Sequence, residues 1–192
     1  MIYLIFLINT AIIMRDLSLH LLDVVQNSVK AKSTLVTISI EIDENGKMKV
    51  TVLDDGCGMS KEMVEQVTNP FFTTRTTREV GLGIPLLMEN AKRTCGDMHI
   101  ESTLGEGTKI VAEFDTKHID ALPLGNMGQT IATLCACYPT QCDFIFTYTK
   151  EEQNVHFDTR EVKEVLQEVP INSHEVLVWI EQSVQEEMKE QL

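Results

Sequence analysis

The chain has 192 residues, which is room for one ordinary domain or two small ones. It is 43% hydrophobic and 23% charged, a balance that favours a packed core and argues against global disorder. The formal net charge of −13 argues against nucleic acid or anionic lipid as a partner. It does not exclude a small polyanion such as a nucleotide, because backbone amides and a metal ion can hold one.

The charge is uneven along the chain. Residues 1–116 carry 11 basic and 16 acidic residues, whereas the shorter segment 117–192 carries 5 basic and 13 acidic residues. This shift in composition predicts two parts. We expect an N-terminal extension over 1–13, one domain over 14–116, and a small acidic C-terminal α+β domain over 117–192.

Residues 1–13 read MIYLIFLINTAII and are almost wholly apolar. The stretch is shorter than the roughly 20 residues that a membrane-spanning helix needs, and it lacks the basic start and cleavage site of a signal peptide. Because a good helix begins soon after Met14, we interpret Met14 as the true first residue; an interfacial anchor is the alternative. We therefore expect a cytoplasmic protein without stable membrane insertion.

The five cysteines do not predict a disulfide framework, because their number is odd and no secretory context is visible. Cys135, Cys137 and Cys142 form a C-x-C-x4-C pattern that matches no zinc or iron–sulfur spacing. We interpret them as free thiols buried on an apolar helix.

Hydrophobic periodicity predicts the elements of the first 115 residues. Residues 16–31 place apolar side chains on one stripe at helical spacing, and residues 34–42 alternate as a half-buried strand does. The chain then gives a tight turn at 44–47, a returning strand over 48–53, a short helix over 60–67 capped by Ser60, a loop over 68–83, a helix over 84–95 ended by Gly96, and strands over 97–102 and 108–114.

The remaining elements follow a connection at 115–126. We predict a helix near 127–137, strands near 143–149 and 154–158, a helix from about 160, and a last helix over about 173–189. Asp158 and Glu161 match a capping box at the start of the helix near 160. Hairpin-linked strands with interspersed helices predict an α+β layer sandwich and not a doubly wound parallel sheet.

Three glycine-bearing loops each follow an apolar element, at 54–59, 81–83 and 105–108. None matches a P-loop or a Rossmann fingerprint, and an isolated glycine pair is usually only a turn. Their order and their neighbours make them informative. An upstream helix carries Asp23 and Asn27 at i, i+4, and the segment PFFTTR lies between the first two loops.

These residues suit the binding of a nucleotide with a metal ion. Asp23 and Asn27 lie on a largely apolar helix, and oxygen ligands of this kind suit Mg²⁺ bridging phosphates. Gly83 opens a helix whose free N–H groups form an anion site. Asp54 ends a strand as a fixed acceptor for an exocyclic amine.

In order, the segments DVVQNSVKA, DDGCGM, PFFTTR, GLGIPLL and GDMHIESTLGEGT resemble the nucleotide-binding boxes of the GHKL ATPase/kinase superfamily. That superfamily includes gyrase, the ninety-kilodalton heat-shock chaperone, histidine kinases and MutL, and its domain is the Bergerat fold, an α/β sandwich. The resemblance covers about residues 16–115 and implies ATP and Mg²⁺ as cofactors. Residues 117–192 lie outside it.

The resemblance implies a role for each matching position. Asn27 would ligate Mg²⁺, Lys30 would contact phosphate, and Asp54 would bind the adenine amino group. The implied contacts of the loops are Gly56 and Gly58 near the base, Gly81 and Gly83 around the phosphates, Thr108 in support of the adenine site, Arg75 at the terminal phosphates, and Met59, Thr73, Thr74 and Leu82 as further nucleotide contacts. Phe71 and Phe72 belong either to the lid edge or to the core.

The branch of the superfamily is suggested by what lies around these boxes. The lid is short, which resembles the histidine kinase and anti-sigma-factor kinase branches, yet we expect no phosphoacceptor hairpin before Asp16. Asp23 stands where many members carry the glutamate general base. The resemblance implies an Mg-ATP-binding protein that transfers the γ-phosphoryl group to a partner protein, as a histidine or serine kinase or an ATPase. A switch without phosphotransfer is the alternative, and a homodimer agrees with family analogy.

Overall fold

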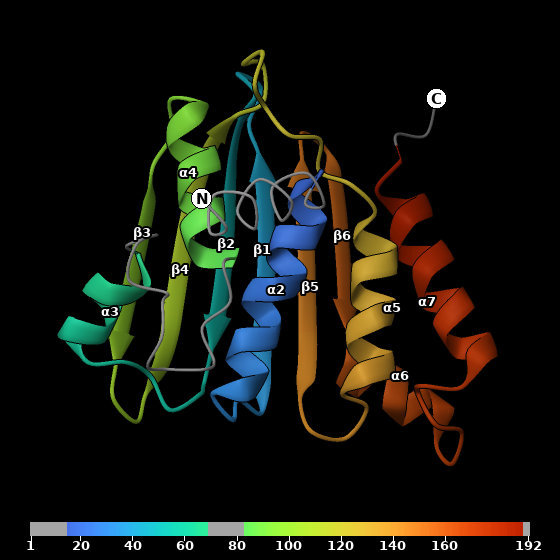
Figure 1. Ribbon diagram of the computed structural model, residues 1–192. Helices are drawn as coiled ribbons and strands as arrows, with labels where there is room; N and C mark the ends of the chain where they lie inside the picture. Colours follow the sequence, from blue (N-terminus) through green and yellow to red (C-terminus); the bar gives the residue numbers. More distant parts are fainter. Residues whose placement is uncertain (1–14, 69–82, 190–192) are drawn as a thin grey trace, which may run out of the picture.

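A computed structural model describes residues 15–68 and 83–189 (Figure 1). The helices of this part are α2 (Leu17–Lys30), α3 (Lys61–Val67), α4 (Gly83–Arg93), α5 (Met127–Cys137), α6 (Thr159–Leu166) and α7 (His174–Glu187). The strands are β1 (Leu35–Ile42), β2 (Lys47–Asp54), β3 (Met98–Thr103), β4 (Gly107–Asp115), β5 (Asp143–Lys150) and β6 (Gln153–Asp158).

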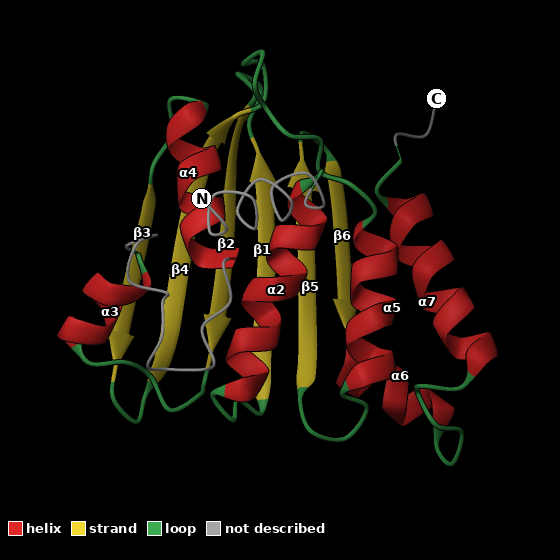
Figure 2. Cartoon of the chain, viewed as in Figure 1, coloured by secondary structure: helices red, strands yellow, loops and turns green. Residues whose placement is uncertain are grey.

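The strands form one six-stranded sheet in the order β3-β4-β2-β1-β5-β6. Neighbouring strands run antiparallel except β1 and β5, which are parallel and aligned from Leu35 with Asp143 to Ile42 with Lys150. The sheet therefore continues across residue 117, since β5 pairs directly with β1. The α+β class expected from the strand pattern is confirmed (Figure 2).

The core lies between one face of this sheet and the helices. α2, α4 and α5 lie over that face, and α7 packs beside α5 (Figure 1). The strand alternation explains the layering: Val36, Ile38 and Ile40 of β1 are buried, while the residues between them are only partly so. Phe144 and Phe146 of β5 belong to the same buried cluster, so both parts of the chain share one core.

The element ends follow local capping. Ser60 Oγ accepts from the Met63 N–H at 3.3 Å, which confirms it as the cap of α3. The helix predicted over 84–95 spans Gly83–Arg93 instead, because Cys95 adopts a left-handed φ of 59° and the Gly96 N–H turns back to the Ala91 carbonyl. The predicted loop over 68–83 lies almost wholly outside the described residues.

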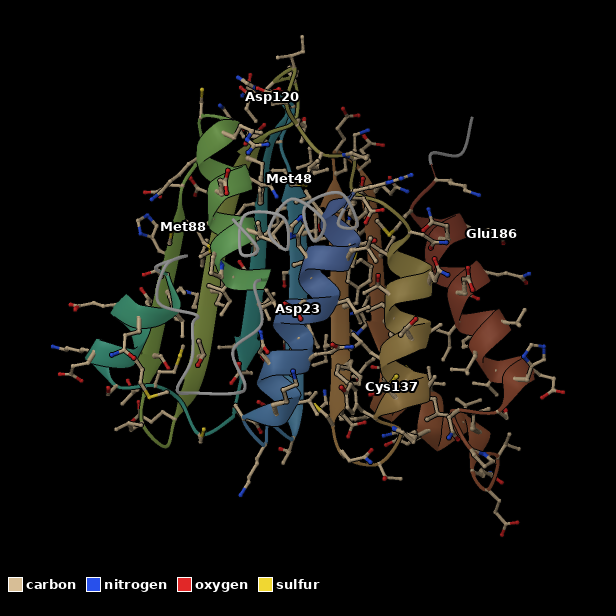
Figure 3. All side chains as sticks on the ribbon, in the orientation of Figure 1. Asp23, Met48, Met88, Asp120, Cys137 and Glu186 are labelled. Carbon is tan, nitrogen blue, oxygen red and sulfur yellow. The ribbon has the colours of Figure 1, made fainter. Side chains whose placement is uncertain are left out.

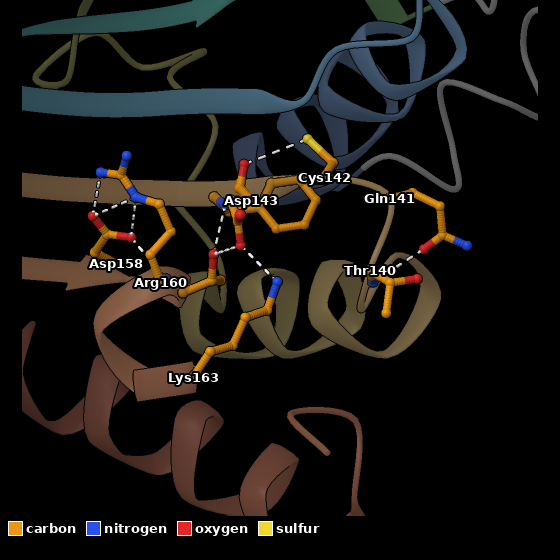
Figure 4. A network of polar contacts seen from close by, with 9 residues as sticks. Thr140, Gln141, Cys142, Asp143, Asp158, Arg160 and Lys163 are labelled. Carbon is orange, nitrogen blue, oxygen red and sulfur yellow. Dashed lines mark hydrogen bonds and ion pairs between the residues drawn. The ribbon is translucent and has the colours of Figure 1, made fainter. Parts of the chain in front are cut away.

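A polar network fixes the start of β5 and α6 in the acidic segment (Figure 4). Asp143 Oδ1 accepts from the Thr159 hydroxyl at 2.8 Å and from the Lys163 ammonium at 2.6 Å. Asp158 caps α6 through the Arg160 N–H and also binds the Arg160 guanidinium, whose hydrogen bonds lower the pKa of the Asp158 carboxyl. Asp158 is thus the cap of α6, as expected, but the capping box is not complete: within the described residues Glu161 does not bond back to Asp158, and its Oε1 lies 4.0 Å from His156 Nε2.

The cysteines are all free thiols. Cys135 and Cys142 are buried, and desolvation raises the pKa of each thiol to about 12. Cys137, at the end of α5, is exposed, so the prediction that it is buried is wrong (Figure 3). The reason is its place in the last turn of α5, on the side away from the core.

Within residues 15–68 and 83–189, none of the helices is both apolar and long enough to cross a membrane.

Candidate functional site

Helix α2 carries the first part of the site. Its apolar stripe faces the core, and Asp16 caps its start by accepting from the Leu19 N–H at 3.1 Å. Asp23 lies on the side toward α4, where its Oδ2 accepts from the Gly83 N–H at 2.8 Å (Figure 3). A side chain at position 83 would collide with the same carboxylate. The N-terminus of α4, expected to be an anion site, therefore faces the carboxylate of Asp23.

Asn27 lies one turn after Asp23 on the same helix. Both polar atoms of its amide are buried, and neither has a hydrogen-bond partner among the residues that the structure describes. A buried amide without partners costs free energy, commonly about 1–3 kcal/mol for each unsatisfied group. Such an amide fits a group that is bound from outside the chain. Its carbonyl oxygen is a suitable ligand for Mg²⁺, so the residues present fit the ion that the family resemblance implies.

Asp54 is held at the end of β2. Its side chain is buried, with Oδ2 accepting from the Ser28 hydroxyl at 2.6 Å and Oδ1 accepting from the Gly56 N–H at 3.0 Å. Gly56 has no room for a side chain, because a Cβ there would lie 2.6 Å from Ser33 Oγ. Each oxygen of the Asp54 carboxylate thus accepts one hydrogen bond, one from α2 and one from the loop that follows β2.

The loop after Asp54 is tied to the end of α2. The Cys57 N–H donates to the Ala31 carbonyl at 2.9 Å. Asp55 accepts from the N–H groups of Thr34 and Leu35 at 2.7 and 3.0 Å and from the Thr34 hydroxyl. Partial burial opposes ionisation of Asp55, but these hydrogen bonds lower its pKa below the ordinary value. The loop at 54–58 therefore has a defined position relative to Asn27.

The β3–β4 hairpin closes the other side of the loop through Ser102. Ser102 Oγ accepts from the Met59 N–H at 2.8 Å, donates to the Gly107 carbonyl at 2.9 Å, and lies 2.9 Å from Thr108 Oγ1. Thr108 is directly opposite Asp54 in the β2–β4 register. Gly58, at φ 63°, has no space for a Cβ against the Thr103 carbonyl, so only glycine fits this crossing.

The structure brings together several of the predicted residues: Asp23 with Gly83, and Asp54 with Gly56, Thr108, Gly58 and Met59 through the contacts above. Lys30 is exposed at the end of α2. Thr73, Thr74, Arg75, Gly81, Leu82, Phe71 and Phe72 lie outside the described residues. Sequence reasoning missed Ser28 and Ser102. One sequence feature could have indicated Ser28 as part of the site, namely its place directly after Asn27. For Ser102 the only such feature was its position across the hairpin from Thr108.

His20 is the buried imidazole of α2, one turn before Asp23. Its Nε2 lies 3.1 Å from Asn90 Nδ2 on α4. Desolvation lowers the pKa of His20, although the charges of Asp16 and Asp23 oppose that shift. Burial therefore favours the neutral ring, in which Nε2 can accept a hydrogen bond from the Asn90 amide.

The family described as "Histidine kinase-, DNA gyrase B-, and HSP90-like ATPase" matches residues 14–118, more than half of the chain. This chain belongs to that family. The GHKL resemblance is thereby confirmed, and residues 14–118 form an ATP-binding module of the GHKL class.

The chain is similar to segments of sensor proteins and kinases. A putative sensor protein of Shewanella frigidimarina (strain NCIMB 400) is 36% identical over 94 residues, which cover 47% of this chain and 14% of that protein. Sporulation kinase C of Bacillus subtilis (strain 168) is 32% identical over 89 residues, or 45% of this chain and 20% of the kinase. The matched segment is therefore a minor part of each relative.

A solved structure shows the same fold. The N-terminal domain of a DNA repair protein aligns with a TM-score of 0.50 and 13% sequence identity, over 73% of this chain and 51% of that one. At this identity the likeness concerns the fold alone. It agrees with the Bergerat-type sandwich that the glycine loops and the strand order indicate.

Proposed function

We propose that this chain binds Mg-ATP at the site formed by α2, the loop at 54–59, the β3–β4 hairpin and the start of α4, and that it transfers the γ-phosphoryl group to a partner protein. The observation that carries the proposal is Asn27, whose amide is buried with both polar atoms unpartnered in the described part of the chain. The next residue of the helix, Ser28, donates to Asp54, a buried carboxylate held in place as an acceptor.

Each group of the site has a distinct task in this proposal. Asn27 Oδ1 would hold Mg²⁺, which would neutralise phosphate charge when bound. Asp54 accepts from the 6-amino group of adenine. Asp23 uses one oxygen for the Gly83 N–H, and we assign its other oxygen to polarise the hydroxyl or water that receives the phosphoryl group. Lys30 and Arg75 contact phosphate, as the family resemblance implies.

Phosphotransfer to a protein is supported by the relatives. Sporulation kinase C and the sensor histidine kinase AtsR of Burkholderia thailandensis carry segments similar to this one. In the proposed reaction the acceptor side chain forms a bond to the γ-phosphorus, the bond between that phosphorus and the β–γ bridging oxygen breaks, and ADP leaves. We infer that the acceptor belongs to another polypeptide.

The test uses labelled ATP, Mg²⁺ and native cell extract with three proteins. These are the wild type, Asn27→Ala, and Asn172→Ala as a matched control, since Asn172 is exposed before α7 and far along the chain from the site. We expect label on a specific protein with the wild type and the control, and loss of that label with Asn27→Ala. ATP binding without label on any extract protein would overturn the phosphotransfer proposal and leave a binding module.

A further inference from the structure

Ser28 connects the helix that carries Asn27 to the residue that recognises the base. Its side chain is buried, and its hydroxyl donates to Asp54 Oδ2 at 2.6 Å across 26 positions of the sequence. The hydroxyl has a single proton, and this bond uses it. Ser28 therefore acts on Asp54 as a donor.

Ser28 is itself fixed by the turn that follows α2. Its carbonyl oxygen accepts from the Ser33 hydroxyl at 2.7 Å and from the Ser33 N–H at 3.2 Å. Ser33 in turn lies against Gly56, where a Cβ would meet its Oγ. The backbone of Ser28 is thus held by hydrogen bonds in a position from which its hydroxyl reaches Asp54. A shift of Ser28 away from Asp54 would disturb both the turn at Ser33 and the loop at Gly56.

The two donors on Asp54 determine how the carboxylate can meet a ligand. Ser28 occupies Oδ2 and the Gly56 N–H occupies Oδ1, so neither oxygen is free to rotate away from its present direction. The two oxygens of a carboxylate offer about four acceptor sites, so acceptor capacity remains for one further donor. An exocyclic amine supplies such a donor, whereas a carbonyl oxygen at the same place would face the carboxylate as one acceptor against another.

We propose that Ser28 is a positioning residue that sets base specificity: by holding Asp54 as a fixed acceptor, it selects a purine with a 6-amino group over one with a 6-oxo group or with hydrogen. This inference rests on the proposed function, because it assigns a role in nucleotide binding. Ser28 does not touch the nucleotide, and acts through Asp54.

The test measures dissociation constants of three nucleotides with Mg²⁺: ATP, GTP and purine riboside triphosphate, which has hydrogen in place of the 6-amino group. The proteins are the wild type, Ser28→Ala, Ser28→Cys and Ser18→Ala. Ser18 is a matched control, since it is also a buried serine on α2 whose hydroxyl donates to an aspartate, Asp16, at 2.7 Å. Circular dichroism confirms that each variant is folded.

We expect Ser28→Ala to raise the dissociation constant of ATP about tenfold to a hundredfold, because Asp54 is then no longer held to accept from the 6-amino group and a hydrogen bond to a charged group has this weight. The dissociation constant of purine riboside triphosphate, which lacks the amino group, should change less than about threefold. Ser28→Cys, with a weaker donor, gives a smaller loss in the same direction and carries the test if Ser28→Ala does not fold. Ser18→Ala leaves all three constants unchanged.

Equal weakening of ATP and purine riboside triphosphate in both Ser28 variants would overturn the inference and show a structural role only. Unchanged ATP affinity in those variants would overturn it as well. A wild type that binds none of the three nucleotides would overturn the proposed function and this inference together. The two failures are therefore distinguished by the wild type alone.

Discussion

The site region contains a buried amide without a partner among the described residues, whereas the buried charged groups around β5 and α6 are paired. Asn27 keeps both of its buried amide atoms unpartnered in the described structure, although the next residue, Ser28, is hydrogen-bonded to Asp54. Around β5 and α6, Asp143 is satisfied by Thr159 and Lys163, and Asp158 by Arg160 (Figure 4). Gln153 Oε1 is an exception there, but the amide nitrogen of Gln153 still donates to the Glu187 carbonyl.

This difference distinguishes polar groups that stabilise the fold from polar groups that are suited to bind a ligand. A satisfied network stabilises its own elements, whereas a partly satisfied buried group lowers stability until something binds it. Substitutions of polar residues in the acidic C-terminal region should therefore change stability, whereas those in the site region should change nucleotide affinity. The predictions below test this division, from the largest expected effect to the smallest.

The largest effect is expected at the shared core. Phe144 is fully buried on β5, beside β1, so Phe144→Ala should lower the free energy of unfolding by about 3–5 kcal/mol. Because the sheet is continuous, denaturant melts followed by circular dichroism and by nucleotide binding should show one coincident transition. Ile145→Ala, on the other face of the same strand, should cost less. Separate transitions, with nucleotide binding unaffected by Phe144→Ala, would contradict the shared core.

The polar network of the acidic region should affect stability without affecting the site. Asp143→Ala removes the acceptor of the buried Thr159 hydroxyl and of the partly exposed Lys163 ammonium, and should lower the free energy of unfolding by about 1–2 kcal/mol. The dissociation constant of Mg-ATP should stay within about twofold of wild type, as it should for the exposed control Asp120→Ala. A tenfold loss of ATP affinity in Asp143→Ala would remove the distinction between the two regions.

The smallest expected effect is the change that His20 causes in the free energy of unfolding as the pH varies. Its folded-state pKa lies below the unfolded value of 6.5, so below about pH 6.5 the unfolded chain binds more protons than the folded one. The stability that the folded chain keeps by burying His20 in its neutral form is therefore fully present above pH 6.5, and it is lost as the pH falls toward the folded pKa of His20. Urea melts between pH 7.5 and 5 should show a weaker pH dependence for His20→Gln than for wild type, while the exposed control His99→Gln keeps the wild-type profile. An unchanged profile for His20→Gln would refute this assignment.

The sequence predicted most elements because their patterns are local. Alternation in β1, the cap at Ser60 and the turn at Gly96 all depend on residues within a few positions of one another. The end of α4 was misplaced by two residues because the left-handed Cys95 has no clear sequence signal.

Contacts between distant segments were harder to predict. The bond from Ser28 to Asp54 joins residues 26 positions apart, and the place of Ser28 directly after Asn27 does not indicate which distant residue it contacts. The pairing of β5 with β1 was also hidden, because charge composition reports which residues face solvent and carries no information on which strands are neighbours.

The most direct test of the central claim measures the stability of Asn27→Ala with and without Mg-ATP. Without ligand, we expect the variant to be at least as stable as wild type, because it removes a buried amide that has no partner in the described structure. At a nucleotide concentration about a hundredfold above the wild-type dissociation constant, the wild type should gain about 2.7 kcal/mol and the variant less than about 1 kcal/mol. A ligand-free variant that is clearly less stable than wild type, yet gains as much from Mg-ATP, would contradict the account.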